Sequence, residues 1–537
     1  MRSPLFLPFA FLCAAGLLAA ACEPPAGRGP GSPGDGRSGA LKRGNGGDPG
    51  TLDPAAAEDV HAFNVLIDLY EGLVVQDADG ALVPGAAAVW EVSEDGTRYR
   101  FALRKSARWS NGEPLLARHF VDGIRHVAGA GSRSPNAFLL SPLENFAAVS
   151  RGELPAERLG IIATGDHSLE LKLSQAARYF PSVLSMPIAF PRLIDEHANP
   201  KAFTEAAHFV GNGPYLLEEW RIGSHIRLRK NHAFRAASEV SIEAVEYFAV
   251  EDPHTEYNLY RTGELDITST IPPSVLADAR QERPDEVRIS PALAVYYLAF
   301  DLSEPPMSVI EARKALSMAI DRHTLTEVLA RGEQAAFNLV PPGVSEHDPA
   351  EYSWKGLPRG QREQAARQAY AKAGYSSASP MTVKLTYDAG DVHEQVALIV
   401  SSMWEEVLGA NVELEKLEWK IFLDTRAQHA NWQIMRFAWF GDYDDASTFT
   451  DIFRSDSLQN LPGYSSRQYD ELLDIAGTQS DPVLRRKLMS SAERVLIDDY
   501  PIVPLYFYVN KHLVDPRVEG FLPNALDRHA TRTLSLR

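Results

Sequence analysis

The sequence predicts a mixed α/β (α+β) fold made of lobes that are joined by crossing connections. Segments with helical periodicity alternate with short strand-like segments along the 537 residues. There is no internal repeat of roughly 20–50 residues, which excludes a solenoid or a propeller, and no long linker interrupts the body. Hydrophobic residues make up 45% and charged residues 23% of the chain, as in ordinary globular proteins. Connections of this kind favour ligand sites between domains.

The N-terminus has the features of a secretory signal. Met1 and Arg2 precede an apolar run over residues 5–21, which ends in small residues before Cys22. The run is short for a membrane span, which needs about 20 apolar residues, so residues 1–21 are predicted to be a signal peptide. The sequence before Cys22 resembles a bacterial lipobox, although Leu18 stands one place earlier than usual. We therefore expect lipidation of Cys22; ordinary cleavage after Ala21 is the alternative.

Removal of the signal peptide would leave a mature chain with one cysteine and a polar N-terminal segment. Cys13 is the only other cysteine and would leave with the signal, so the mature chain cannot form an internal disulfide. Residues 22–40 are rich in Pro, Gly and Ser and are predicted to be a disordered tether. The net charge of −18 argues against nucleic acid or an anionic membrane surface as a partner.

In the first half of the body, residues 64–75 are predicted to be a helical turn that leads into a buried segment. Asp95-Gly96 is a hairpin signal, and the alternation that follows it predicts a half-buried strand over residues 99–103. Residues 118–127 are predicted to form a helix that carries His119 and His126. These two histidines are two turns apart, about 10 Å, which is too far for one metal ion, so we interpret them as surface residues.

The second half continues with both periodicities. Ser308 is a plausible N-cap for a helix that runs to residue 320. The other predicted strands cover residues 216–220, 225–228, 295–300 and 502–509, and the other predicted helices cover residues 362–373, 394–408, 467–476 and 482–497.

No local motif for catalysis, nucleotide binding or metal binding is present. The chain lacks Gly-x-Ser-x-Gly, Gly-x-x-x-x-Gly-Lys, His-Glu-x-x-His and Cys-x-x-Cys motifs. Asp442, Asp444 and Asp445 are not embedded in EF-hand spacing. We therefore expect no catalytic residue, no cofactor and no metal site, although a Ser/His/Asp site assembled from distant segments stays possible.

The segment from Arg436 to Tyr443 offers a binding site for a zwitterion. It places a cation, Arg436, a large aromatic, Trp439, and a carboxylate, Asp442, at spacings of three residues. A free peptide needs an anion for its ammonium, a cation for its carboxylate and an apolar wall between them. The alternative is that Arg436 and Asp442 pair with each other.

Several segments in order resemble one family from about residue 41 to the C-terminus. The chain resembles the bacterial extracellular solute-binding proteins of peptide ABC transporters, and in particular their oligopeptide-binding branch. The matching segments are Leu52-Asp53-Pro54, Leu69-Tyr70-Glu71-Gly72-Leu73, Trp109-Ser110-Asn111-Gly112-Glu113-Pro114, Gly211-Asn212-Gly213-Pro214-Tyr215, Tyr260-Arg261-Thr262-Gly263-Glu264, Arg313-Lys314-Ala315-Leu316, Ala319-Ile320-Asp321-Arg322, Asp391-Val392-His393 and Glu418-Trp419-Lys420.

The resemblance implies a periplasmic-binding-protein-like architecture of two hinged lobes and an additional domain, with the ligand in the cleft between the lobes. Lobe I would be discontinuous, comprising residues 41–70, 190–293 and 510–537. Residues 71–189 would form the extra domain II, and residues 294–509 would form lobe III. The expected protein is a monomeric, non-enzymatic component of an importer, located in the periplasm, with oligopeptides and the ABC permease and ATPase subunits as partners.

The resemblance also implies roles for particular residues. Asp442 would hold the α-ammonium of the peptide, and Arg436 and His393 would receive its carboxylate. The remaining expected peptide-binding residues are Trp439, Trp419, Tyr508 and Tyr297 as pocket aromatics, Phe440 beside the ligand backbone, and Arg426, Glu58 and Val60 at the cleft wall. His393 could instead cap the helix that follows it, and Trp419 and Tyr508 could instead be core residues.

The sequence departs from the oligopeptide branch at some positions. A lysine that receives shorter peptides there has no counterpart in residues 327–331, unless Arg331 replaces it. Asn136 and Phe138 stand where the family has tyrosines, and Phe440 replaces a smaller residue. A murein peptide, a dipeptide or another solute is therefore the alternative ligand, and a lipid-anchored hydrolase is the alternative from another class.

Overall fold

The structure is a computed structural model that describes residues 39–537, with the exception of Arg133, Ala198, Pro200, His429, Ala430, Leu458 and Ser480. The predicted signal peptide, Cys22 and nearly all of the predicted tether lie outside these residues. No helix in the described part of the chain has the length and apolar character needed to cross a membrane.

A four-stranded sheet joins the beginning of the body to its middle. The strands predicted over residues 216–220 and 225–228 are confirmed as β8 and β9, which pair at one end of the sheet, and β1 runs parallel to β10 at the other edge. The order across the sheet is β1 (Ala40–Gly44), β10 (Ala244–Phe248), β9 (His225–Lys230) and β8 (Tyr215–Arg221).

A second four-stranded sheet is antiparallel throughout and packs against helix α2 (Ala117–Ala128). Gly96 has a φ of +67° at the predicted hairpin. The strand after it buries every second residue, as its alternation predicts. The order is β4 (Ala87–Val92), β5 (Arg98–Leu103), β7 (Ser168–Lys172) and β6 (Ile161–Gly165).

The prediction that His119 is a surface residue is wrong, whereas His126 is exposed. His119 is only 3% exposed, and its Nδ1 accepts a hydrogen bond from the indole Nε1 of Trp109 at 3.0 Å. It also accepts one from the backbone N–H of Leu116 at 3.1 Å. Trp109 precedes the helix that carries His119, so the pattern within the helix could not reveal that this histidine is buried.

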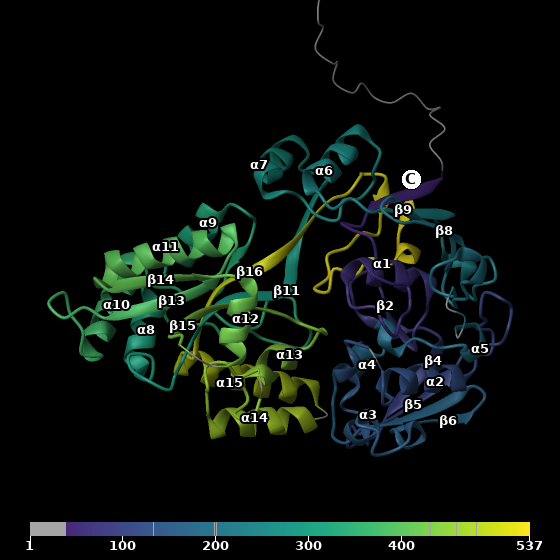
Figure 1. Ribbon diagram of the computed structural model, residues 1–537, viewed down its shortest axis with the longest axis horizontal. Coiled ribbons are helices and arrows are strands. Elements are labelled where there is room, and N and C mark those ends of the chain that lie inside the picture. The colour runs from purple at the N-terminus through teal and green to yellow at the C-terminus, as the bar shows by residue number, and fades with distance from the viewer. Residues whose placement is uncertain are drawn as a thin grey trace, which may run out of the picture. The chain divides into compact units, whose positions relative to one another are not determined.

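The largest sheet has six strands and mixes both directions. Strand β11 pairs antiparallel with β15 and with β16, whereas β13 runs parallel to both of its neighbours. The long strands β11 and β16 lie side by side (Figure 1), and their ladder is interrupted between Pro291 and Val295. The order is β12 (Gln334–Ala335), β16 (Ile502–Leu513), β11 (Val287–Phe300), β15 (Ile434–Phe440), β13 (Thr382–Asp388) and β14 (Asn411–Leu417).

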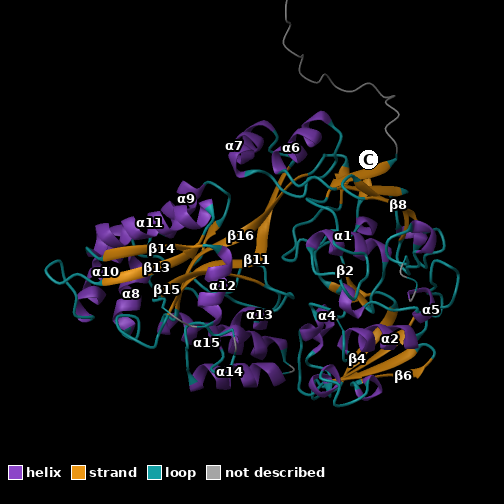
Figure 2. Ribbon diagram, in the orientation of Figure 1, coloured by secondary structure: helices purple, strands orange, loops and turns teal. Residues whose placement is uncertain are grey.

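Helices lie beside the strands of this sheet (Figure 2). Their side chains contribute to two hydrophobic clusters that share the sheet. The predicted helices are confirmed apart from small shifts at their ends; the first begins at Ile310 with Val309 as its N-cap, so the prediction of Ser308 as the cap is wrong. One cluster includes α8 (Ile310–Ala319), α9 (Arg322–Leu329), α10 (Arg359–Lys372) and α11 (Asp391–Leu408). The other includes α12 (Trp419–Ala427), α13 (Ser447–Thr450), α14 (Arg467–Thr478) and α15 (Pro482–Asp499).

A single hydrophobic cluster runs through both four-stranded sheets and helix α1, with Leu66, Phe101 and Val245 among its members. The six-stranded sheet has its own clusters. The domain boundaries stay a prediction; β11 and β16 each extend across a predicted boundary. The remaining elements are α1 (Val60–Leu69), α3 (Phe146–Ser150), α4 (Phe180–Val183), α5 (Ile194–His197), α6 (Pro253–Thr262), α7 (Pro273–Glu282), β2 (Val74–Gln76), β3 (Leu82–Pro84), β17 (Val518–Glu519) and β18 (Ser535–Leu536).

Two of the sequence motifs pack directly against each other at the end of α1. The side chain of Asn212 donates to the carbonyl of Glu71 at 2.8 Å and accepts from its N–H at 3.2 Å. A Cβ on Gly213 would lie 2.5 Å from the backbone carbonyl carbon of Leu69. The glycine is therefore required by close backbone contact, and these motifs are structural rather than ligand-binding.

Candidate ligand-binding site

The polar centre of the predicted site is an ion pair between Arg436 on β15 and Asp388 at the end of β13. Both Nε and Nη2 of Arg436 contact Oδ1 of Asp388, and the two residues are 9% and 6% exposed. The alternative that Arg436 pairs with Asp442 is therefore wrong. Because Asp388 neutralises Arg436, this arginine does not present an uncompensated charge to a ligand.

His393 lies in the first turn of α11, next to this ion pair. Its Nε2 is 3.9 Å from Asp388, and its Nδ1 is 3.3 Å from the hydroxyl of Tyr296. Gly390 is the N-cap, so the alternative that His393 caps the helix is wrong. Burial and the charge of Arg436 lower the pKa of His393, and Asp388 opposes them. The imidazole is therefore a neutral hydrogen-bonding group at neutral pH.

A row of aromatic rings extends from His393 to an exposed edge. Tyr296 stacks on His393 with centroids 5.7 Å apart and on Tyr506 at 4.8 Å. Tyr508 contacts Tyr506 at 5.4 Å and Phe440 at 5.2 Å. Phe440 is 62% exposed, whereas Tyr508 is half-buried against the core. The rings thus form a wall that is open to solvent at one end.

Helix α12 adds aromatic and cationic groups on the other side of the ion pair. Trp419, its first residue, is 51% exposed and stacks on Phe422 at 6.0 Å. Phe422 in turn lies 5.1 Å from the guanidinium of Arg436. The core alternative for Trp419 is therefore wrong. Arg426 lies 5.0 Å over the ring of Phe437.

Two predicted aromatics belong to the opposite face of the sheet. Successive side chains in a strand point to opposite faces, so Arg436 and Trp439 do not share a face despite their spacing of three. Trp439 packs against the cluster that contains Tyr297, which is only 2% exposed. The indole N–H of Trp439 is buried and has no hydrogen-bond partner among the described residues.

Asp442, just beyond β15, differs from the two acids that follow it. Asp444 accepts a hydrogen bond from the backbone N–H of Ser345 at 2.9 Å, and Asp445 pairs with Arg485 at 2.8 Å. Within the described part of the chain, no group donates to or pairs with the half-buried carboxylate of Asp442. Burial raises its pKa to about 6. No cation in the described residues therefore neutralises this carboxylate.

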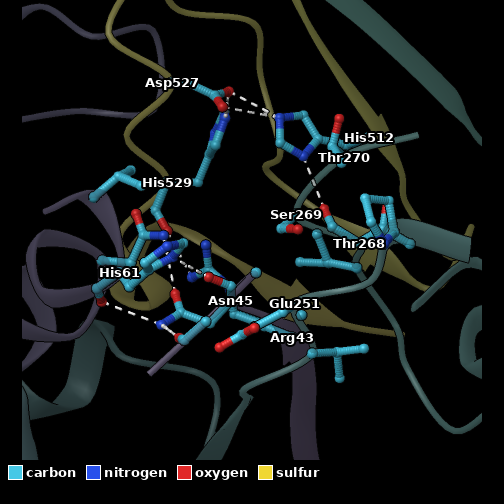
Figure 3. Close-up of a pocket in the computed structure, with 18 of the residues that line it drawn as sticks. Arg43, Asn45, His61, Glu251, Thr268, Ser269, Thr270, His512, Asp527 and His529 are labelled. Carbon is cyan, nitrogen blue, oxygen red and sulfur yellow. Dashed lines mark hydrogen bonds and ion pairs between the residues drawn. The ribbon is translucent and has the colours of Figure 1, made fainter. Parts of the chain in front are cut away.

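Glu58 and Val60 lie at the start of α1, where both are exposed. Asp59 between them caps the helix by accepting from the N–H of Ala62 at 2.7 Å. Val60 lines a cavity of about 590 Å³ between β1, α1 and the C-terminal segment (Figure 3). It is the one predicted peptide-binding residue among those that line this cavity.

Sequence reasoning missed Asp388, Tyr296 and Tyr506. Asp388 is an isolated acid at a strand end, without a motif around it, and its partner is 48 residues away. The tyrosines carry only a weak signal, because they are buried in strands whose neighbouring residues are almost all buried as well.

Comparisons with known proteins identify the family. Residues 81–460 match the family described as "Bacterial extracellular solute-binding proteins, family 5 Middle". The probable deoxycholate-binding periplasmic protein of Escherichia coli is 34% identical over 479 residues, covering 88% of this chain and 89% of its own length. The periplasmic oligopeptide-binding protein of Salmonella typhimurium is 34% identical over 488 residues, covering 90% and 89%.

Solved structures agree. The unliganded open form of the periplasmic murein tripeptide-binding protein MppA gives a TM-score of 0.87 at 29% identity and covers 93% of this chain and 97% of its own. Haemophilus influenzae OppA in complex with the peptide RPPGFSPFR gives a TM-score of 0.72 at 31% identity, covering 93% and 98%. The periplasmic-binding-protein-like fold is thereby confirmed, as is the expectation of a binding protein rather than an enzyme. The chain belongs to family 5 of the bacterial extracellular solute-binding proteins.

Proposed function

We propose that this protein captures oligopeptides in the periplasm and delivers them to the permease of an ABC importer. The observation that carries the proposal is the half-buried carboxylate of Asp442, which has no partner among the residues that the structure describes. An α-ammonium group is the cation that all unblocked peptides share, and pairing with it would offset the cost of burying this carboxylate. Relatives at this level of identity are named oligopeptide-binding proteins.

The carboxylate end of the peptide would meet a weaker anchor. Arg436 is neutralised by Asp388, and His393 is neutral. Arg331 interacts electrostatically with His393 but pairs with Glu333 at 3.2 Å. A ligand carboxylate would therefore receive hydrogen bonds rather than a full opposite charge. This arrangement favours a peptide whose N-terminus is held in a fixed position and whose C-terminus can vary.

Side-chain selectivity is expected to be low. Phe440 and Trp419 present exposed rings, which offer apolar contact without a specific hydrogen-bond pattern. Recognition of the peptide backbone, with waters around the side chains, suits such surfaces.

A bile acid or a murein peptide is the second candidate ligand. The relative named as probably deoxycholate-binding is as similar in sequence as the oligopeptide-binding proteins, and the structure of a murein tripeptide-binding protein matches this fold well. Deoxycholate carries a carboxylate and no ammonium group. It would therefore leave Asp442 without a counter-charge, which favours a peptide with a free amine.

The N-terminal features complete the proposal. Lipidation of Cys22 would attach the mature, monomeric protein to a membrane, with residues 22–40 as the tether. Fractionation of the native protein and of Cys22→Ser after labelling with a fatty acid tests this part. Incorporation of label into the native protein alone supports the anchor, and equal labelling of both excludes it.

The main experiment has two steps. The purified protein is unfolded, and the released small molecules are identified by mass spectrometry. Peptides found there are then synthesised with a free and with an acetylated N-terminus, and both are titrated calorimetrically. We expect mixed peptides and at least a hundredfold loss on acetylation. Release of a single non-peptide species, or equal affinity for both forms, would refute peptide capture through Asp442.

A further inference from the structure

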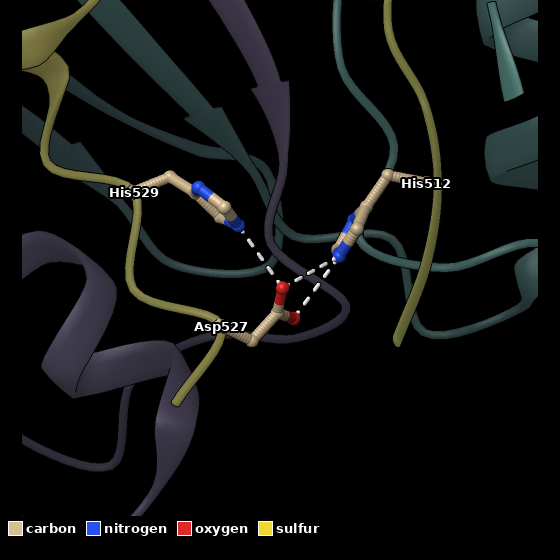
Figure 4. Close-up of side chains that lie close together, drawn as sticks. All are labelled: His512, Asp527 and His529. Carbon is tan, nitrogen blue, oxygen red and sulfur yellow. Dashed lines mark hydrogen bonds and ion pairs between the residues drawn. The ribbon is translucent and has the colours of Figure 1, made fainter. Parts of the chain in front are cut away.

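Three potential metal ligands from the C-terminal part of the chain meet outside the predicted peptide site. The carboxylate of Asp527 lies between two imidazoles (Figure 4). Both of its oxygens are 3.0 Å from Nε2 of His512, and Oδ1 is 3.0 Å from Nε2 of His529. One ligand atom from each residue can be chosen so that all lie within 4.8 Å of one another. No charge from the peptide-binding site takes part in this cluster.

The orientation of His512 is that of a metal ligand with an outer hydrogen bond. His512 lies near the end of β16 and is 7% exposed. Its Nδ1 is 2.8 Å from the carbonyl oxygen of Thr268, to which it donates. Histidines that bind metals commonly donate their second ring N–H to such a carbonyl, which fixes the tautomer and aims the other nitrogen at the ion.

The loop that carries the other two ligands is held in place by its own contacts. Asn524 clamps it, donating to the carbonyl of Arg528 and accepting from the Arg528 N–H, both at 3.0 Å. The ring of His529 stacks on Phe521 at 3.7 Å. Asp527 itself has a φ of +55°, a conformation that non-glycine residues adopt only when the surroundings enforce it. The ligands are thus positioned before any ion binds.

The spacing suits a small divalent ion. Imidazole nitrogens and carboxylate oxygens bind Zn²⁺ at about 2.0–2.2 Å, so ligands in a tetrahedral site are roughly 3.3–3.6 Å apart. The imidazole–carboxylate distances of 3.0 Å need to lengthen slightly, and the two imidazole nitrogens, which lie within 4.8 Å of each other, need to come closer together. His512, Asp527 and His529 also line the cavity of about 590 Å³ (Figure 3), from which water could supply a fourth ligand.

The surrounding charges admit a cation. The nearby Arg43 points its Nη1 at the backbone oxygen of His529, at 2.7 Å, rather than at the imidazole. Its charge interacts with the buried carboxylate of Asp68. The same cavity is lined by two further acids, Asp48 and Glu251. Among the residues that line the cavity, the acids therefore outnumber Arg43, the one arginine there.

We propose that His512, Asp527 and His529 bind one divalent transition-metal ion, with Zn²⁺ as the expected species. Two imidazoles and one carboxylate with an open position is a common zinc ligand set. The ion would link β16 to the C-terminal loop and so tie together segments that are distant in sequence. Binding to the folded state alone stabilises that state.

The test uses the full mature protein without a histidine tag, stripped with a chelator and dialysed. Zn²⁺ is titrated calorimetrically into the native protein, His529→Gln and Asp527→Asn. His232→Gln is the matched control, because the side chain of His232 is 74% exposed. We expect one Zn²⁺ per native chain, unchanged binding in the control, and a loss of more than about a hundredfold in the two site variants, which exceeds the effect of removing an outer hydrogen bond.

X-ray absorption at the zinc edge of the native protein keeps the test valid even if a site variant fails to fold. The expected spectrum is that of zinc bound by two imidazoles and by oxygen ligands. Native protein that binds no Zn²⁺, site variants that fold and bind as the native protein does, or a spectrum with fewer than two imidazoles would each overturn the proposal.

Discussion

Replacing Asp442 with asparagine is expected to abolish most peptide binding and at the same time to stabilise the ligand-free protein. The carboxylate is half-buried and has no partner in the described part of the chain, and burial raises its pKa from 3.8 to about 6. A difference of about two pH units corresponds to about 3 kcal/mol against the charged form. Asparagine keeps the shape and removes the charge, so this penalty disappears.

The sign of the stability effect follows from proton binding. The folded state holds the Asp442 proton more tightly than the unfolded state does, so its contribution to the free energy of unfolding falls as pH rises from about 4 to about 6. Above that window the full penalty applies. We therefore expect Asp442→Asn to raise the free energy of unfolding at neutral pH by up to about 3 kcal/mol, measured by urea denaturation.

The effect on binding has the opposite sign. Removing one partner of a desolvated ion pair costs about 3–5 kcal/mol, which is roughly a 150- to 5,000-fold rise in Kd. Below about pH 6 the native protein should lose affinity by up to about tenfold per pH unit, because the carboxylate must be ionised to hold the ammonium. The variant should lack this dependence.

Calorimetric titration of one unblocked peptide across the pH range measures both effects. Asp444→Asn is the matched control, because its side chain can still accept the hydrogen bond from Ser345; its affinity should equal that of the native protein. An Asp442→Asn protein with native affinity and a native pH profile would refute the assignment of Asp442 as the ammonium anchor.

Three further predictions concern other parts of the structure. Asp388→Asn should lower the free energy of unfolding by about 3 kcal/mol in urea denaturation, because it leaves the buried Arg436 without its counter-charge; unchanged stability would mean that the pair contributes nothing. Trp419→Ala should change stability by no more than about 0.5 kcal/mol yet weaken peptide binding in calorimetry, since the ring is 51% exposed; a large loss of stability would instead indicate a core role. Gly213→Ala should lower the melting temperature in circular dichroism, because its Cβ would press on the backbone of Leu69 at a cost of about 1–3 kcal/mol or more; a native melting temperature would contradict this packing.

Local periodicity predicted much of the fold because short-range patterns report burial. The alternation in residues 98–103 and the long helix ending at Leu408 are both present in the structure. The same reasoning misplaced the zwitterion pattern, since a spacing of three joins one face of a helix but opposite faces of a strand. Arg436 and Trp439 lie on such a strand.

Contacts between distant segments could not be predicted in this way. Asp388 has no sequence signature. It pairs with Arg436 only because β13 and β15 are neighbours in the sheet. His512 and Asp527 come from a strand and a loop that the fold brings together, with no metal-binding spacing between them. Such sites are determined by tertiary packing, which a single sequence does not display.

The interruption of the β11–β16 ladder has a mechanical consequence. Any rotation of the segments joined by these strands would bend both at once, and the ladder is already irregular between Pro291 and Val295 and again between Tyr296 and Tyr297. Displacement in a rotation grows with the radius from its axis. Tyr296 adjoins this break and so would travel through a short arc, which would preserve its contacts with Tyr506 and His393. The aromatic wall would then stay in place beside the ligand. Side chains farther from the rotation axis would move towards the ligand and enclose it.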